Sequence, residues 1–354
     1  MVNLPVGVAA LVLTRWKMEE SKTAYAARPD WAGFVTLTAG SISLVYGLIR
    51  AGEMAWSDTV VDICLALAAF FFVAFVALER RADHPLFDLS LFRIPTFSGG
   101  LAAAFAMNGS LYAMLVYLVL YLQDDLGYSA LATGIRLLLI IGASTVASMF
   151  AGVFSERMPV RWLIGPGLLL VGMGLLLMTG LDGSSSWTHL IPGFIVAGVG
   201  SGMVNPPLAS TAVGVVAPHR SGMASGVNTT FREIGIATGI AVYGSVFASA
   251  LRQKLGHALA NIPSLERHLA GAVTAVQQGN AAQAINAVPS PLRAPLVAAV
   301  HASFASALDV LLVVSAVLAL VGAACSGILI RRRDFVVSPH QPTPAPTEPL
   351  GSPA

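Results

Sequence analysis

The sequence predicts an all-α protein, a polytopic bundle of transmembrane helices. Hydrophobic residues make up 56% of the 354-residue chain and charged residues only 11%, and its mean hydropathy is +0.76. Soluble domains carry roughly a quarter charged residues. The apolar residues are also gathered into runs of the length that crosses a bilayer. Lipid is therefore expected to be the solvent for most of this chain.

The first apolar run, Met1–Leu13, holds 13 residues and ends at Thr14-Arg15. A membrane-crossing helix needs about 20 residues, so we interpret residues 1–15 as a truncated span. About eight full spans are expected after it: Ala32–Ala51, Thr59–Leu78, Thr96–Leu122, Leu131–Phe154, Trp162–Leu181, Trp187–Val216, Gly222–Leu251 and Ser303–Ile330.

The charges in the connecting loops alternate along the chain. One set of loops carries Arg15, Lys17, Lys22 and Arg28, then Arg80, Arg81 and Arg93, then Arg157 and Arg161, then His219 and Arg220, and finally Arg331, Arg332 and Arg333. The other set carries Glu53, Asp58, Asp124, Asp125 and Asp182. The positive-inside rule places the first set in the cytoplasm. This predicts a multi-pass protein of the plasma membrane, the bacterial inner membrane, with a cytoplasmic C-terminus.

Three further segments complete the expected layout. Residues 252–300 form a long outer loop, in which Leu255–Leu259 and Ala270–Ala287 are weakly amphipathic and suit a helix lying on the membrane surface. Residues 334–354 are expected to be a disordered cytoplasmic tail, because six prolines lie in 337–354 among Ser and Thr. Cys64 and Cys325 both lie in apolar runs and are interpreted as packing residues.

Several motifs resemble those of one transporter family. They are Asn3-Leu4-Pro5-Val6-Gly7, Arg28-Pro29-Asp30-Trp31-Ala32-Gly33, the loop from Gly152 to Arg161, Gly198-x-Gly200-x-Gly202 with Asn205-Pro206-Pro207, and the run from Ser221 to Gly235 followed by Gly239. They resemble the fourteen-span drug:proton antiporters of the major facilitator superfamily. The loop departs from the family pattern, because Glu156 stands for Asp and Pro159 for Gly, which weakens its turn geometry.

The resemblance implies an arrangement of the whole chain. It makes 1–15 the sixth span, 31–79 two central extra spans, 80–95 a cytoplasmic loop and 96–333 the C-terminal six-span half. The first five spans would be absent, so a separate front-half polypeptide becomes a possible partner. The implied activity is proton-coupled efflux of small amphipathic compounds, including drugs, by alternating access. The implied partners are lipid, protons and a small-molecule substrate.

Polar side chains within the spans are the candidates for a substrate cavity, because a charge at the bilayer centre costs about 2.5–3.5 kcal/mol on insertion scales. Arg232 and Glu233 lie about 15 Å along their helix from Gly222, too deep for easy contact with water. Asn228, Arg232 and Gly235 share one helix face. Lining a cavity and pairing with neighbouring helices are equally consistent with this pattern. The full candidate set is Asn108, Tyr112, Tyr117, Asn205, Asn228, Arg232, Glu233 and Asp309. For Asp309 an interfacial position within reach of outer water is favoured.

Two further groups of residues are expected to control conformation. Gly152, Glu156, Arg157 and Arg161 form a candidate lock loop, whose cations would pair with acidic residues or helix C-termini; simple topology-setting charge is the alternative. A second group provides hinges or close helix packing. It comprises Gly198, Gly202, Pro206, Pro207, Gly222, Gly226, Gly235 and Gly239. Pro206-Pro207 is expected to kink or break its span.

Other classes of function find little support in the sequence. It carries no nucleophile elbow, phosphate loop or paired metal-ligand motif, and its net charge is +2. We therefore expect no enzymatic activity, cofactor, metal or nucleic acid. The alternatives to a transporter are a non-transporting truncated remnant and a membrane scaffold subunit. An in-frame extension encoding five more spans upstream of Met1 would favour the transporter.

Overall fold

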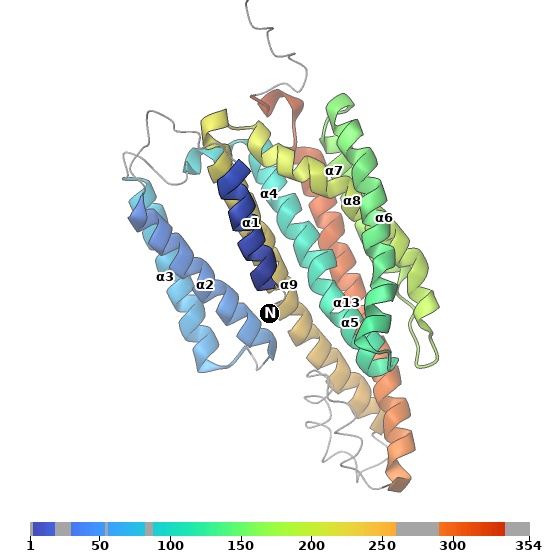
Figure 1. Cartoon of the computed structure of the whole chain (residues 1–354). Coiled ribbons are helices and arrows are strands. Elements are labelled where there is room, and N and C mark those ends of the chain that lie inside the picture. The colour runs from blue at the N-terminus through green and yellow to red at the C-terminus, as the bar shows by residue number, and fades with distance from the viewer. Residues whose placement is uncertain (1–2, 18–29, 54–55, 82–87, 260–289, 337–354) are drawn as a thin grey trace, which may run out of the picture.

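A computed structural model describes residues 3–17, 30–53, 56–81, 88–259 and 290–336 (Figure 1). Every regular element within these ranges is helical. Seven of the described helical segments are long and apolar enough to cross a membrane, and the 17-residue Arg161–Leu177 is a shorter apolar helix. The all-α, membrane-type fold that the sequence predicts is confirmed.

The helices follow the expected spans, except that α9 and α13 are each longer at one end. Their bounds are α1 Asn3–Lys17, α2 Trp31–Glu53, α3 Thr59–Glu79, α4 Pro95–Met107, α5 Ala113–Leu120, α6 Ala130–Arg157, α7 Arg161–Leu177, α8 Ile191–Gly214, α9 Ser221–Leu259 and α13 Ser290–Leu329. Short 3₁₀ turns lie between them: η1 Leu89–Arg93, η4 Trp187–Leu190, η5 Pro218–Arg220 and η6 Arg332–Asp334. Two wider π-helical turns, η2 Asn108–Tyr112 and η3 Tyr121–Asp125, join α4 and α5 into one segment, Pro95–Asp125.

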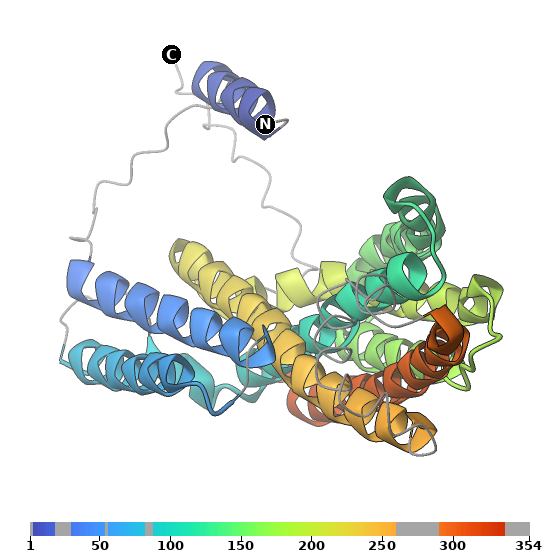
Figure 2. The same cartoon turned by 90° about the horizontal axis from the view of Figure 1, so that it is seen from below.

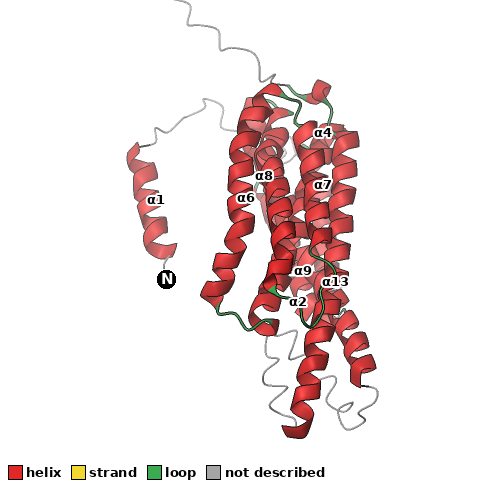
Figure 3. Ribbon diagram, turned by 90° about the vertical axis from the view of Figure 1, so that its right-hand side faces the viewer, coloured by secondary structure: helices red, strands yellow, loops and turns green. Residues whose placement is uncertain are grey.

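The helices from α4 to α13 form one bundle around a shared apolar core. In it α8 packs between α6 and α7, while α13 contacts α4, α7 and α9. Aromatic side chains fill its centre, including the fully buried Tyr121, Tyr243, Phe247 and Phe304. Figure 2 shows α2 and α3 as an antiparallel pair beside α9, with α1 standing apart from the bundle, and Figure 3 shows α1 from another side.

Glycine sets how closely the central helices approach. A Cβ atom at Gly202 would lie 2.2 Å from the Ser144 carbonyl oxygen of α6, and one at Gly239 would lie 2.5 Å from the Gly109 carbonyl oxygen. Gly198 and Gly235 face α6 and α4 in the same way. By contrast, Gly222 and Gly226 have nothing within 4 Å of the same position. The chain has three such pairs of glycines four residues apart in α8 and α9. Two of the pairs make close helix contacts, and the third, Gly222 with Gly226, does not.

Pro206 and Pro207 do not break their span, because α8 runs from Ile191 to Gly214 through both residues. A proline lacks the N–H that would bond to the carbonyl four residues earlier. For Pro206 that acceptor is the Gly202 carbonyl, which receives the Ser148 hydroxyl of α6 at 3.1 Å instead. Such a side-chain donor from a neighbouring helix lets a proline remain within a membrane helix. The expected break is thus prevented.

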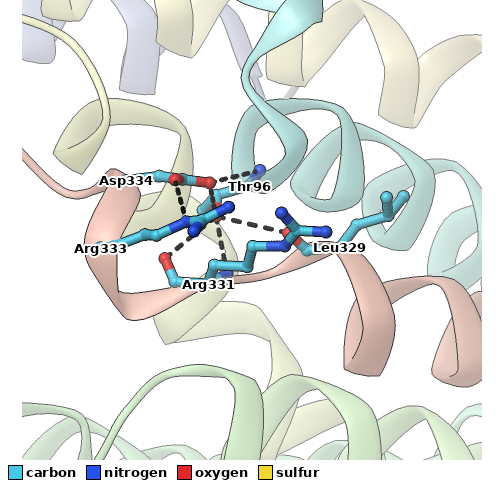
Figure 4. A network of polar contacts seen from close by, with 5 residues as sticks. All are labelled: Thr96, Leu329, Arg331, Arg333 and Asp334. Carbon is cyan, nitrogen blue, oxygen red and sulfur yellow. Dashed lines mark hydrogen bonds and ion pairs between the residues drawn. The ribbon is translucent and has the colours of Figure 1, made fainter.

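The first turn of α4 is capped by residues from the other end of the chain (Figure 4). Its own N-cap residue, Ile94, offers no side-chain acceptor. Instead, the Asp334 carboxylate accepts from the Thr96 N–H at 3.2 Å and from its hydroxyl at 2.7 Å, and the Arg331 N–H donates to that hydroxyl at 2.7 Å. A carboxylate is favourable at a helix N-terminus. This contact joins the first and last helices of the bundle.

The ends of α3, α6, α8 and α13, with the arginine-bearing turns between helices, lie at one end of the molecule (Figure 1). That end facing the cytoplasm stays a prediction. At the opposite end the expected loop 252–300 is shorter, because α9 continues to Leu259 and α13 begins at Ser290. At 1.5 Å per residue, helices of 39 and 40 residues exceed the roughly 30 Å hydrocarbon core. Segment 270–287 and the tail from 337 lie outside the described residues.

The glycine contacts give a matched prediction. Gly239→Ala places a methyl group against the Gly109 backbone and Ala113, so we expect destabilisation of about 1–3 kcal/mol, the usual cost of overpacking. Gly226→Ala meets open space, so it gains only the helix propensity of alanine. Thermal unfolding in detergent should lower the Tm of the first variant and leave that of the second equal or higher. Equal effects would contradict this packing.

Candidate functional site

Three of the predicted cavity residues, from three different helices, form one chain of hydrogen bonds. The Arg232 guanidinium of α9 donates to Asn205 Oδ1 of α8 at 3.0 Å. Asn205 Nδ2 donates in turn to the Tyr112 hydroxyl of η2 at 3.2 Å. All three side chains are half-buried. The arginine that the sequence places deep in its span therefore has a polar partner within the bundle.

Serines extend this chain to α6. Ser201 Oγ lies 2.9 Å from Ser144 Oγ, and Ser201 is also the residue whose carbonyl accepts from Asn205 at 3.0 Å. One turn further along α6, Ser148 bonds to the Gly202 carbonyl. We call Tyr112, Ser144, Ser148, Ser201, Asn205 and Arg232 the polar stripe. Sequence reasoning missed its serines, although Ser144 and Ser148 stand four residues apart within an apolar span.

The stripe borders a cavity between η2, α6 and α8. This cavity has a volume of about 480 Å³, and Tyr112, Ser144, Ser148 and Ser201 line it. Its remaining walls are mostly apolar, with Leu111, Leu115, Ile140, Ile141, Thr145 and Met149. Small-molecule sites combine this range of volume with mainly apolar walls and a few polar groups. The arrangement suits a small molecule that has both apolar and polar parts.

Glu233 faces a different side of α9. Its exposed side chain lines a groove of about 660 Å³ between α2 and α9, with Thr38 and Ser41 on the α2 side and Gly226 on the α9 side. Consecutive residues on a helix point about 100° apart, since a turn holds 3.6 residues. Arg232 and Glu233 therefore serve two separate surfaces, and the structure does not bring them together.

Three other predicted residues are buried in helix packing. Asn108 Nδ2 bonds within its own helix to the Ala104 carbonyl at 2.8 Å. The Tyr117 hydroxyl donates to the Ile240 carbonyl of α9 at 3.2 Å. Asn228 is 4% exposed, and its Nδ2 has no hydrogen-bond partner among the described residues. None of the three lines either of the two cavities described above.

Asp309 holds a loop at the end of the bundle opposite the arginine-bearing turns. Its carboxylate accepts from the Gly180 N–H at 3.1 Å and from the Leu181 N–H at 3.2 Å, just after α7. Gly180 adopts a φ of 85°, which favours glycine at this turn. The geometry gives Asp309 a positioning role in the α7–α8 connection.

The candidate lock loop lies at the arginine-bearing end, where Gly152, Glu156 and Arg157 belong to the last turns of α6 and Arg161 begins α7. Neither arginine has an ion pair within the described part of the chain, and Arg161 lies against the ring of Trp162, 5.3 Å from its centroid. An ion pair between separate segments at this end is instead formed by Arg220 and Asp88, at 2.7 Å.

The Arg220–Asp88 contact ties the segment before α4 to the turn before α9. Asp88 also caps η1 by accepting from the Ser90 N–H at 2.9 Å. Hydrogen bonds from Ser90 and the neighbouring Arg220 guanidinium hold the pKa of the Asp88 carboxyl below its usual range. The carboxylate is therefore charged, and the contact intact, at neutral pH.

Long apolar helices, a polar stripe at mid-helix and a cavity of mixed character define an integral membrane bundle of the kind found in transporters. The sequence model of the Major Facilitator Superfamily matches residues 1–240. The chain belongs to this superfamily. Family membership places it among membrane transporters and not among enzymes.

Curated relatives of the chain are resistance and export proteins of bacteria. It is 33% identical to the multidrug resistance protein Stp of Mycobacterium tuberculosis over 266 residues. This matched stretch covers 75% of this chain and 48% of Stp. It is 32% identical to the puromycin resistance protein pur8 of Streptomyces alboniger, over 70% of this chain and 50% of that one. The chain thus spans about half the length of these relatives.

Two further comparisons cover more of the chain. It is 28% identical over 98% of its length to the tetracenomycin C resistance and export protein of Streptomyces glaucescens, covering 65% of that protein. A similar fold is found in the crystal structure of a bacterial homolog of the human lysosomal transporter Spinster, in an inward-facing and occupied conformation. The match covers 86% of this chain and 68% of that chain, with a TM-score of 0.53 and 16% sequence identity. This last similarity supports the fold.

The polar stripe predicts energetic coupling between α8 and α9. Arg232→Met and Asn205→Leu each remove one side of the bond, so their effects on the free energy of unfolding should be non-additive by about 0.5–3 kcal/mol. Glu233→Gln combined with Asn205→Leu is the matched control, and we expect additivity there because the two side chains face different surfaces. Denaturant unfolding in micelles measures both cycles, and additivity in the first would refute the contact.

Proposed function

We propose that the described helices form one wall of the substrate pathway in a proton-coupled exporter of small amphipathic compounds. The observation that carries this proposal is the polar stripe beside an otherwise apolar cavity of about 480 Å³. A purely structural bundle has no need to hold Arg232, Asn205 and Tyr112 together at mid-membrane depth, where polar groups are costly.

The chemistry of this wall suits amphipathic molecules. Leucine, isoleucine and methionine side chains bury apolar surface, while the Tyr112 hydroxyl and the serines offer hydrogen bonds that fix orientation. Arg232 supplies a positive charge held in place by Asn205. The names of the relatives, with multidrug, puromycin and tetracenomycin C resistance, support the same class of substrate for this chain.

Alternating access is the mechanism that we propose for this wall. The backbone contacts at Gly198 and Gly202 join α8 to α6, and those at Gly235 and Gly239 join α9 to α4 and η2. Helices packed this closely move as rigid units, and small residues at the contacts permit short sliding movements. The Arg157 and Arg161 turn then remains a proposed lock, available to an acidic partner in another conformation.

An export assay tests this proposal. The gene is expressed with its natural flanking sequence in a drug-sensitised bacterial host, and efflux of ethidium and of puromycin is followed with and without a protonophore. We expect proton-dependent export that falls about tenfold or more in Arg232→Gln, since a hydrogen bond to a charged group contributes roughly 1.5–3 kcal/mol. Thr36→Val on the surface of α2 is the control. Unchanged export in Arg232→Gln would remove the stripe from the pathway.

A further inference from the structure

A buried carboxylate and a histidine meet at the end of the bundle opposite the arginine-bearing turns. Asp125 ends η3, and its Oδ1 lies 2.8 Å from His301 Nδ1 of α13. The Asp125 side chain is only 5% exposed, whereas that of His301 is 35% exposed. The carboxylate is thus enclosed by protein, while the imidazole retains contact with the surroundings.

Asp309 and Asp182, at the same end, accept from hydrogen-bond donors that do not change charge. Asp309 accepts from the backbone N–H groups of Gly180 and Leu181. Asp182 accepts from the hydroxyls of Ser184 and Ser185, and these bonds hold its pKa below the usual range. Asp125 differs because its partner is an imidazole, the side chain that normally gains or loses a proton between about pH 5 and 8.

We propose that Asp125 and His301 together form a proton-binding site that serves the exporter proposed above. With a neutral imidazole donating through Nδ1, the pair carries one negative charge. Uptake of one proton by the other ring nitrogen makes the pair neutral overall, and its release restores the negative charge. No other bond changes. The exposed part of His301 provides the route for that proton to and from water.

The surroundings favour one proton as the ligand of this site. The charged groups that act on Asp125 are His301 of α13 and its own neighbour Asp124. Fully buried Tyr121, four residues before Asp125, packs against Phe304, three residues after His301, with 6.0 Å between the ring centroids. A negative pair next to a second acid is costly in this enclosed position, and a bound proton relieves that cost.

The site and the polar stripe share one helical segment. Asp125 and Tyr112 belong to the same helical segment, Pro95–Asp125, 13 residues apart and therefore about 20 Å along the axis. Each lies in a π-helical turn, a form that is rare and often occurs at functional sites. A change in the bond that ties this segment to α13 would therefore act on the helix that carries Tyr112.

A titration of the intact chain tests the site without transport. The protein is labelled with ¹⁵N-histidine in lipid nanodiscs, and the His301 signal is identified by its loss in His301→Gln. We expect the imidazole to carry its hydrogen on Nδ1, toward Asp125, when the pair is negative, and to hold a second proton when the pair is neutral. In Asp125→Asn the midpoint of the His301 titration should fall by about one pH unit or more, because the imidazolium loses its counter-charge. Asp182→Asn should leave it in place. An unchanged midpoint in Asp125→Asn would overturn the proposal.

Transport gives a second, separable readout. We expect His301→Gln and Asp125→Asn to lose the dependence of export on outside pH while retaining exchange of labelled substrate, which needs no net proton movement. Loss of both activities with normal unfolding would mean that the pair acts only structurally, against the proposal. Should the wild-type protein show no proton-driven export, the proposed function is wrong, and the histidine titration then decides alone whether the pair binds a proton.

Discussion

The requirement that every backbone polar group find a partner inside the protein organises this bundle. Lipid offers no hydrogen bonds, so each irregular position in a helix must be completed by a neighbour. The Gly202 carbonyl, freed by Pro206, receives Ser148 from α6. At the wide turn η2, the Gly109 carbonyl accepts the Tyr243 hydroxyl at 2.7 Å, and the Ser110 carbonyl accepts from Ser315 of α13 at 3.0 Å. The irregular positions are therefore the points at which helices are joined.

Close glycine contacts make these cross-connections possible. Because Gly239 packs directly on the Gly109 backbone, α9 comes near enough for Tyr243, one turn later, to reach the same carbonyl. Packing and polar bonding thus depend on one another, and the polar stripe lies where both coincide. On the opposite surface of α9, where Gly226 meets open space, Glu233 lines a groove instead.

The sequence was sufficient for the architecture because hydropathy and loop charge are local properties. Most expected spans, such as Thr59–Leu78 against the observed Thr59–Glu79, agree within a few residues, but α9 ends 8 residues later and α13 begins 13 residues earlier than expected. It also identified Arg232, Asn205 and Tyr112 as candidates, since a polar residue in an apolar run is conspicuous. It could not pair them, and it missed Ser144 and His301, because pairing depends on which helices are neighbours. Likewise, spacing alone could not separate Gly239, against a backbone, from Gly226, which faces open space.

The segment Pro95–Asp125 connects the residues on which both proposals rest. Its first turn is capped by Asp334, its middle carries Tyr112 of the polar stripe, and its last turn holds Asp125 against His301. Both Asp334 and His301 belong to the stretch formed by α13 and η6, so both ends of the Pro95–Asp125 segment are fixed to this one stretch. If the bond at the Asp125 end changes with protonation while the Thr96 cap holds, the movement that results must occur between these anchors. That interval is the part of the helix that borders the cavity, so under the two proposals a proton bound at one end would act on a substrate held beside the polar stripe.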